Sequence, residues 1–159
     1  MTSIESFKEC MRQLTTGVTV ITTISEDNEK SGVTINTFSS LSLDPLLILF
    51  SLKKTSFCYN TFINSKHFTV NILSSDQQKI SDLFTKAGKE KWKEIKTIKD
   101  TLTDCPAIEG SLAFLECAPQ NFYEGGDHTI IVGKVINAVK LADNKKPLVY
   151  FSSNYTNIQ

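Results

Sequence analysis

Short stretches in which apolar and polar residues alternate run along most of the chain, a pattern typical of strands with one buried face. Residues 17–24 alternate and are rich in β-branched side chains, which favours a strand. Residues 46–52 are almost continuously apolar and predict a fully buried strand after a bend at Asp44-Pro45. Further strands are predicted from Gly32 onward and at residues 67–73, 111–117, 129–141 and 148–151.

The first helical pattern lies at the start of the chain. Residues 2–14 predict a helix, with Thr2 and Glu5 at the spacing of a capping box. Its apolar side chains fall on one face at Ile4, Phe7, Met11 and Leu14. A second helix is expected to begin at residues 53–56 and to run to Ile63.

A third helix is predicted after Ser74 and Gln77, which again have capping-box spacing. Residues 87–100 are rich in lysine and predict a partly helical excursion with Trp92 and Ile95 as its large apolar anchors. This excursion is interpreted either as a lid over a site or as a solvated charged helix. Many short strands with antiparallel-style connections and a few helices together predict a β-barrel with helical decoration.

Length and charge narrow the class of protein. The 159 residues suit one domain over residues 1–159, which buries about 70% of its unfolded surface. Seventeen basic and 17 acidic residues give no net charge, which argues against a nucleic acid or an anionic membrane as the main partner. No window approaches the ~18 apolar residues of a membrane span, and the first residues do not resemble a signal peptide. A cytoplasmic protein is expected.

The four cysteines are scattered along the chain, at Cys10, Cys58, Cys105 and Cys117. Their spacing contains no Cys-x-x-Cys pair, so it matches neither a zinc site nor a redox dithiol. They are predicted to be reduced and mostly buried thiols, and no metal site is expected.

Residues 34–45 carry a dense set of short polar side chains directly before the apolar strand. An unpaired buried polar group costs roughly 1–3 kcal/mol, so groups at this place need partners. One interpretation is a site that grips a flat ligand with a hydrogen-bonding edge. The other is a loop that caps its own backbone.

Two further stretches carry side chains that could bind a ligand or take part in catalysis. Lys53 and Lys54 precede a predicted helix whose first turn holds Thr55 and Ser56, an arrangement that favours an anion. The alternative is a simple helix cap with solvated lysines. Gly125-Gly126 predicts a tight turn that brings Asp127 and His128 to the mouth of a strand, where a histidine is also found in purely structural roles.

These pieces, taken in order, resemble the flavin reductase family of short flavin-dependent NAD(P)H reductases. The resemblance is carried by Thr16-Gly17-Val18-Thr19-Val20, Gly32-Val33-Thr34, Ser40-Leu41-Ser42-Leu43-Asp44-Pro45, Phe68-Thr69-Val70-Asn71, Leu115-Glu116-Cys117, Gly126-Asp127-His128 and Pro147-Leu148-Val149-Tyr150. It implies a mainly β fold with helices, a six-stranded antiparallel Greek-key split β-barrel that binds FMN. Asp44-Pro45-Leu46 departs from the double proline usual in the family.

The resemblance also implies roles for particular residues. Lys53 and Ser56 correspond to the phosphate-binding turn, and Ser51 is expected to face the ribityl chain. His128 corresponds to the position that holds the nicotinamide nucleotide near the flavin, with Asp127 beside it, and is the expected catalytic residue. Tyr155 is expected either to cover the site or to be a surface aromatic. The groups expected to surround the ring are Thr34, Asn36, Thr37, Ser39, Ser40, Leu41 and Ser42.

The predicted function is therefore an NAD(P)H:flavin oxidoreductase that transfers a hydride from NADH or NADPH to FMN or FAD. The family implies a homodimer and a partner monooxygenase that receives reduced flavin. No Gly-x-Gly-x-x-Gly opens a βαβ unit, so the nicotinamide nucleotide is expected to bind without a domain of its own. Two alternatives remain: a non-catalytic FMN carrier or sensor, and a flavin enzyme acting directly on an organic substrate, as in relatives of pyridoxamine phosphate oxidase.

Overall fold

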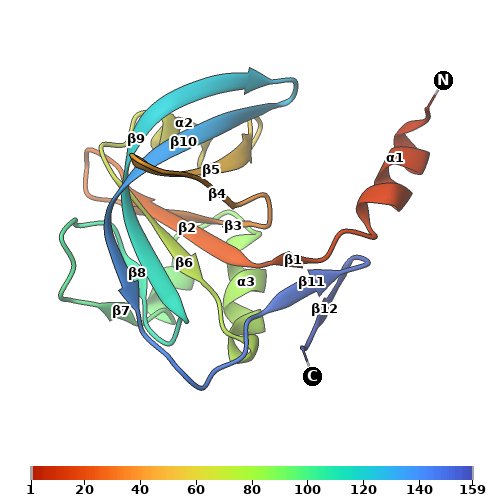
Figure 1. Ribbon diagram of the computed structural model, residues 1–159. Coiled ribbons are helices and arrows are strands. Elements are labelled where there is room, and N and C mark those ends of the chain that lie inside the picture. Colours follow the sequence, from red (N-terminus) through yellow and green to blue (C-terminus); the bar gives the residue numbers. More distant parts are fainter. Residues whose placement is uncertain (1, 159) are drawn as a thin grey trace.

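The structure is a computed structural model that describes residues 2–158, and it is mainly β with a few short helices (Figure 1). All strand pairs are antiparallel among the described residues, which confirms the predicted class. The elements are α1 (Ile4–Met11), β1 (Thr16–Gly17), β2 (Thr19–Ile24), β3 (Lys30–Ile35), β4 (Ser39–Leu43), β5 (Leu46–Lys53), α2 (Tyr59–Ile63), β6 (Phe68–Ile72), the 3₁₀ helix η1 (Ser75–Gln77), α3 (Gln78–Phe84), the 3₁₀ helix η2 (Glu90–Lys93), β7 (Thr97–Ile98), β8 (Ala107–Ile108), β9 (Ala113–Gly125), β10 (His128–Lys140), β11 (Val149–Phe151) and β12 (Asn154–Thr156).

The main sheet is strongly curved. Its strand order is β3-β2-β6-β9-β10-β5-β4, so β3 and β4 are the two edges. Seven strands laid flat would separate the edges by about 29 Å. Only residues 36–38 connect β3 to β4, and they span at most about 15 Å. The sheet must therefore curl until its edges approach, while the predicted six-stranded barrel stays a prediction.

Two apolar clusters fill the two sides of this sheet. The first lies inside the curve, where the ring of Phe50 meets Phe62 and Phe68 edge to face at centroid distances of 6.3 and 5.5 Å. The second lies between the sheet, α3 and the C-terminal strands, around Leu73 and Phe84. The middle strands of the sheet are thus covered by apolar side chains on both faces.

The first helix differs from its prediction in length and cap. It covers Ile4–Met11, and the hydroxyl of Ser3, rather than Thr2, accepts the hydrogen bond from the Ser6 amide at 3.0 Å. No residue of α1 is buried, and the helix lies beside the sheet rather than on it (Figure 1). Its apolar face is consequently exposed in the single chain.

The capping box of Ser74 and Gln77 is confirmed at η1, and α3 follows it as predicted. The helix predicted from residue 53 is wrong at its start, because α2 begins only at Tyr59. Lys53 instead ends β5, where it pairs with His128 of β10. Cross-strand hydrogen bonds thus prevail over the local helical pattern.

The excursion at residues 87–100 contains one turn of 3₁₀ helix, η2. Its Trp92 ring packs edge to face on Phe84, with centroids 5.0 Å apart, so this anchor belongs to the second apolar cluster. The strand predicted at residues 111–117 continues to Gly125. Pro119 can lie inside it because it sits at a register shift opposite Gly133, where a missing N–H is tolerated.

The bend at Asp44-Pro45 is confirmed as the turn between β4 and β5. Cys58, Cys105 and Cys117 are buried free thiols and Cys10 is exposed, as the pattern predicted for most of them. Burial raises the pKa of the Cys117 thiol to about 12. In residues 2–158, no helix has the length and apolar character needed to cross a membrane, and the cytoplasmic location stays a prediction.

Candidate functional site

The hydroxyl-rich segment crosses the seam between the two edges of the curved sheet. Residues 36–38 leave β3 and enter β4, and Thr37 lies next to Ser51 of β5. The Thr37 hydroxyl accepts a hydrogen bond from the Ser51 amide at 3.0 Å and donates one to the Ser51 carbonyl at 3.2 Å. The Thr37 side chain thus satisfies both backbone groups of Ser51, as a neighbouring strand would.

The register between β5 and β10 places three of the predicted site residues on the same face of the sheet. Lys53 lies opposite His128, and Ser51 lies opposite Ile130. Phe50 and Leu52 point into the core, so Ser51 and Lys53 point outward, and directly opposed residues share a face. Ser51, Lys53 and His128 therefore line the outer side of β5 and β10 close to the seam.

The turn before β10 orients His128. Gly126 has a φ of +69°, a left-handed conformation that favours glycine. The Asp127 carbonyl accepts a hydrogen bond from the Lys54 amide at 3.0 Å, and the Asp127 carboxylate lies 2.8 Å from His128 Nδ1. This hydrogen bond lowers the pKa of Asp127. With Nδ1 held by the carboxylate, Nε2 is the ring nitrogen that can meet a ligand.

Residues 53–56 form a turn without a helix directly behind it, and phosphate binding there stays a prediction. The Ser56 amide donates to the Lys53 carbonyl at 2.9 Å, and the Ser56 hydroxyl lies 3.2 Å from the Cys58 thiol. Because α2 begins at Tyr59, the free amides of a helical first turn are not supplied by Thr55 and Ser56. Lys53 is exposed and lies within salt-bridge distance of no carboxylate among residues 2–158, so its charge can meet an anion.

The remaining hydroxyl-rich residues divide between the two interpretations of this segment. Ser39 donates to the Ser40 carbonyl at 3.0 Å and Ser42 accepts from the Asp44 amide at 3.2 Å, so both cap their own backbone. Leu41 is exposed at a register shift in β4. The exposed side chains of Asn36 and Ser40 make no side-chain hydrogen bond within residues 2–158, and they can serve a ligand.

Thr34 and Tyr155 meet on α3, away from His128. The Thr34 hydroxyl donates to the Ser81 carbonyl at 2.6 Å. The Tyr155 hydroxyl lies 2.8 Å from the Ser81 hydroxyl and donates to the Asp82 carboxylate at 3.1 Å. These bonds fix β3 and β12 on α3, which gives both residues a packing role that the sequence did not indicate. Their predicted contact with a cofactor stays a prediction.

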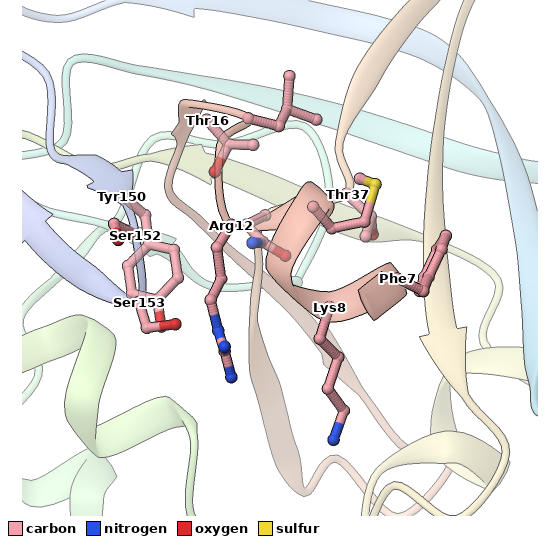
Figure 2. Close-up of a pocket in the computed structure, with 11 residues that line it drawn as sticks. Phe7, Lys8, Arg12, Thr16, Thr37, Tyr150, Ser152 and Ser153 are labelled. Atoms are coloured by element: carbon pink, nitrogen blue, oxygen red, sulfur yellow. The ribbon is translucent and has the colours of Figure 1, made fainter. Parts of the chain in front are cut away.

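A cavity of about 480 Å³ adjoins the seam (Figure 2). Asn36 and Thr37 form part of its wall, to which Lys8 of α1 and Arg12, the residue that caps α1, also contribute (Figure 2). Its remaining lining residues come from α1, the loop that follows it, β1, β11 and the turn between β11 and β12: Phe7, Met11, Leu14, Thr16, Tyr150, Ser152 and Ser153.

This cavity suits a flat ligand with a polar edge. Its wall is largely apolar on the α1 side, and Asn36 adds an amide that no side chain in residues 2–158 engages. The hydroxyl of Thr16 is buried without a hydrogen-bond partner in the described part of the chain. Sequence reasoning missed Thr16, Arg12 and Tyr150 as wall residues, because only the docking of β1 on β11 brings them to the seam.

Residues 11–159 match the protein family described as the flavin reductase like domain. The FMN reductase (NADH) SmoA of Agrobacterium fabrum is 40% identical over 137 residues, which cover 84% of this chain and 75% of that protein. The reductase component of a flavin-dependent trigonelline monooxygenase from Acinetobacter baylyi is 36% identical over 134 residues. That match covers 84% of this chain and 43% of the relative, so the chain spans less than half of that protein's length.

Solved structures agree with this. The NADH:FAD oxidoreductase SgcE6 of Streptomyces globisporus C-1027, in complex with NAD and FAD fragments, superposes with a TM-score of 0.91 at 28% identity. The superposition covers 98% of this chain and 92% of that one. The family match covers nearly the whole chain, and the superposed oxidoreductase shares its fold over almost all of its length. The chain belongs to the flavin reductase like family.

Proposed function

We propose that this chain is an NAD(P)H:flavin oxidoreductase, in which a hydride passes from a nicotinamide nucleotide to FMN or FAD. The observation that carries the proposal is the pairing of β5 with β10, which sets Lys53 opposite His128 on the outer face beside the Thr37 seam. A lysine that can meet an anion and an oriented imidazole thus lie side by side on the outer face of β5 and β10. The family and its named reductases support the same activity.

The flavin would be held by groups along the seam. Asn36 and Ser40, whose side chains form no hydrogen bond within residues 2–158, are available for the ring edge, and the seam residue Thr37 joins them. Ser51 lies on the same outer face for the ribityl chain, and Lys53 and Ser56 follow it for the phosphate. A bound flavin supplies the ring that accepts the hydride, while the protein orients two rings and limits water.

His128 orients the hydride donor in this proposal. Its Nδ1 is engaged by Asp127, so its Nε2 can donate to or accept from a nicotinamide nucleotide without any strong acid or base chemistry. Because His128 lies opposite Lys53, it stands on the β10 side of the proposed flavin site. NADH is the donor named for both SmoA and SgcE6, which supports NADH for this chain.

The finer architecture is part of the proposal. The curved sheet is interpreted as the FMN-binding split barrel, a single domain over residues 1–159. Contact of the edge strand β3 with β5, the neighbour of the other edge strand β4, supports this closure. A second copy would cover the exposed apolar face of α1, where Phe7 is 59% and Leu14 is 58% exposed. Relatives are reductase components of monooxygenases, which supports an oxygenase as the recipient of reduced flavin.

One experiment tests the activity and separates it from a carrier or sensor. The purified protein is mixed with FMN or FAD under anaerobic conditions, and its visible spectrum is followed after addition of NADH or NADPH. A reductase bleaches the flavin band many times faster than free flavin with the same donor. Binding without faster bleaching would leave a carrier, and no binding at tens of micromolar flavin would reject the flavin site altogether.

A further inference from the structure

Thr129 follows His128 directly at the start of β10, and its side chain points to the opposite face of the sheet. It lies opposite Leu52 of β5, which is buried in the core, and it is itself only 3% exposed. Its hydroxyl lies 2.7 Å from the hydroxyl of Tyr59, its hydrogen-bond partner within residues 2–158. The inner face beneath His128 is therefore held by a side chain from a distant part of the sequence.

Tyr59 is itself held in place. It is the first residue of α2, and its ring packs against the first apolar cluster. Its amide donates a hydrogen bond to the Ser56 carbonyl at 3.0 Å, which ties it to the turn at residues 53–56. Backbone and ring thus fix where the Tyr59 hydroxyl lies, and this hydroxyl in turn fixes the side chain of Thr129.

The hydrogen bond to Thr129 bears on His128 through the backbone. Threonine is branched at Cβ and has few favourable rotamers, so a bond that holds its hydroxyl also restricts its backbone. The ring of His128 is oriented by the Asp127 carboxylate, but that side chain is 77% exposed and stands on a glycine turn. Asp127 therefore sets the rotation of the ring, whereas Thr129 sets the place of the strand that carries it.

The other side-chain link at this hairpin is exposed. The Lys54 amide donates to the Asp127 carbonyl at 3.0 Å, and the Lys54 ammonium forms an ion pair with Glu124. The Glu124 side chain is 78% exposed, and exposed ion pairs contribute little and weaken with salt. The bond from Tyr59 to Thr129 reaches a buried hydroxyl, so it is better suited to keep the start of β10 in one place.

We propose that Tyr59 is a positioning residue for hydride transfer, which sets the place of His128 through its hydrogen bond to Thr129. The inference rests on the proposed flavin reductase function and extends it from the outer face of β10 to α2. Tyr59 does not line the cavity beside α1, so it acts through His128 rather than on a ligand there. Loss of its hydroxyl should slow flavin reduction without weakening flavin binding.

Tyr59→Phe keeps the ring and removes the hydroxyl. Anaerobic stopped-flow reduction by NADH gives kcat/KM, and flavin fluorescence gives the dissociation constant of FMN, for the full-length wild type and the variant. We expect kcat/KM to fall about threefold to tenfold, with the loss expected for His128→Ala as the upper limit, and FMN affinity to change less than about twofold. In a His128→Ala background, Tyr59→Phe should change kcat/KM less than about twofold, because the residue through which it acts is gone.

A double variant separates positioning from stability. Tyr59→Phe leaves the Thr129 hydroxyl buried without its partner, so it should also lower the melting temperature. Combining it with Thr129→Val removes both hydroxyls and should recover most of that stability, whereas flavin reduction should stay slow. Thr129→Ser keeps the hydroxyl and should retain most of the wild-type rate. Reduction that recovers together with the melting temperature would make Tyr59 a structural residue and overturn the inference.

Thr23→Val is the matched control, because Thr23 is also fully buried and its hydroxyl donates to the His67 carbonyl at 2.7 Å. It should lower the melting temperature and leave kcat/KM unchanged. A loss of kcat/KM in this control as large as that of Tyr59→Phe, or an unchanged kcat/KM in Tyr59→Phe, overturns the inference. If wild type reduces flavin with neither NADH nor NADPH, the proposed function itself fails, and the inference fails with it.

Discussion

Glu116 is a buried carboxylate on β9 that holds the loop at residues 102–103 against the sheet. It is fully buried and accepts four hydrogen bonds. Three come from the Leu102 amide at 3.0 Å, the Thr103 amide at 2.6 Å and the Thr103 hydroxyl at 2.8 Å, and the fourth from Asn137 at 2.8 Å. Replacing it with glutamine preserves the shape of the side chain and removes its charge.

The size of the effect follows from these bonds. The amide of glutamine keeps one acceptor oxygen, which can still serve the Thr103 pair. Its NH₂ group then faces two donors, of which Asn137 can rotate its own amide to respond, whereas the Leu102 amide cannot. One unsatisfied donor and the loss of charge assistance should cost about 2–4 kcal/mol. For a chain of this length, the melting temperature should fall by roughly 5–15 °C.

The pH dependence has a definite sign. Burial by itself raises the pKa of Glu116, but the hydrogen bonds from Asn137, Leu102 and Thr103 outweigh it, and the pKa is lowered. A lowered folded-state pKa adds stability above the unfolded value of about 4.3, and this stability is lost as the pH falls through the folded-state pKa. The difference between wild type and Glu116→Gln should therefore be full at pH 7 and shrink below about pH 4.

Urea unfolding at pH 7 and at several lower pH values measures this difference. Glu109→Gln is the control, since Glu109 is exposed and forms no ion pair among the described residues. It should change the free energy of unfolding by less than about 0.5 kcal/mol. The reasoning is refuted if Glu116→Gln unfolds within that margin of wild type at pH 7, or if the gap between them is equally large at every pH.

Three further predictions concern the site and the assembly. Lys53→Ala combined with Ser56→Ala should weaken FMN more than riboflavin, at about 1.5–3 kcal/mol for each charge-assisted bond lost, and equal loss in a binding titration would place the phosphate elsewhere. His128→Ala should leave flavin affinity nearly unchanged and lower kcat/KM for the nicotinamide nucleotide about tenfold, some 1.4 kcal/mol, in anaerobic stopped-flow reduction. A variant that melts earlier but reduces flavin at the normal rate would make His128 structural. Phe7→Lys should shift the protein from dimer toward monomer in sedimentation velocity, because it places a charge on the exposed apolar face of α1. A wild-type protein that sediments as a monomer would show that this face forms no dimer interface.

Local pattern was sufficient wherever neighbours in the chain decide the structure. Alternation and β-branched residues predicted β2 and β10, and Ser74 with Gln77 predicted the start of the third helix. The glycine pair predicted the turn at Gly126 that delivers His128. In each case the determining contacts are a few residues apart, so the sequence carries them directly.

Only the tertiary structure decided which polar side chains meet. Lys53 leaves its predicted helix because β10 pairs with it, Thr37 finds Ser51 because the sheet curls, and Thr34 turns to Ser81 because α3 docks there. Among many lysines, Lys91 alone lies between two aromatic rings in the described chain. These partners are far apart in sequence, and their meeting depends on register and on the curvature of the whole sheet, which no local period encodes.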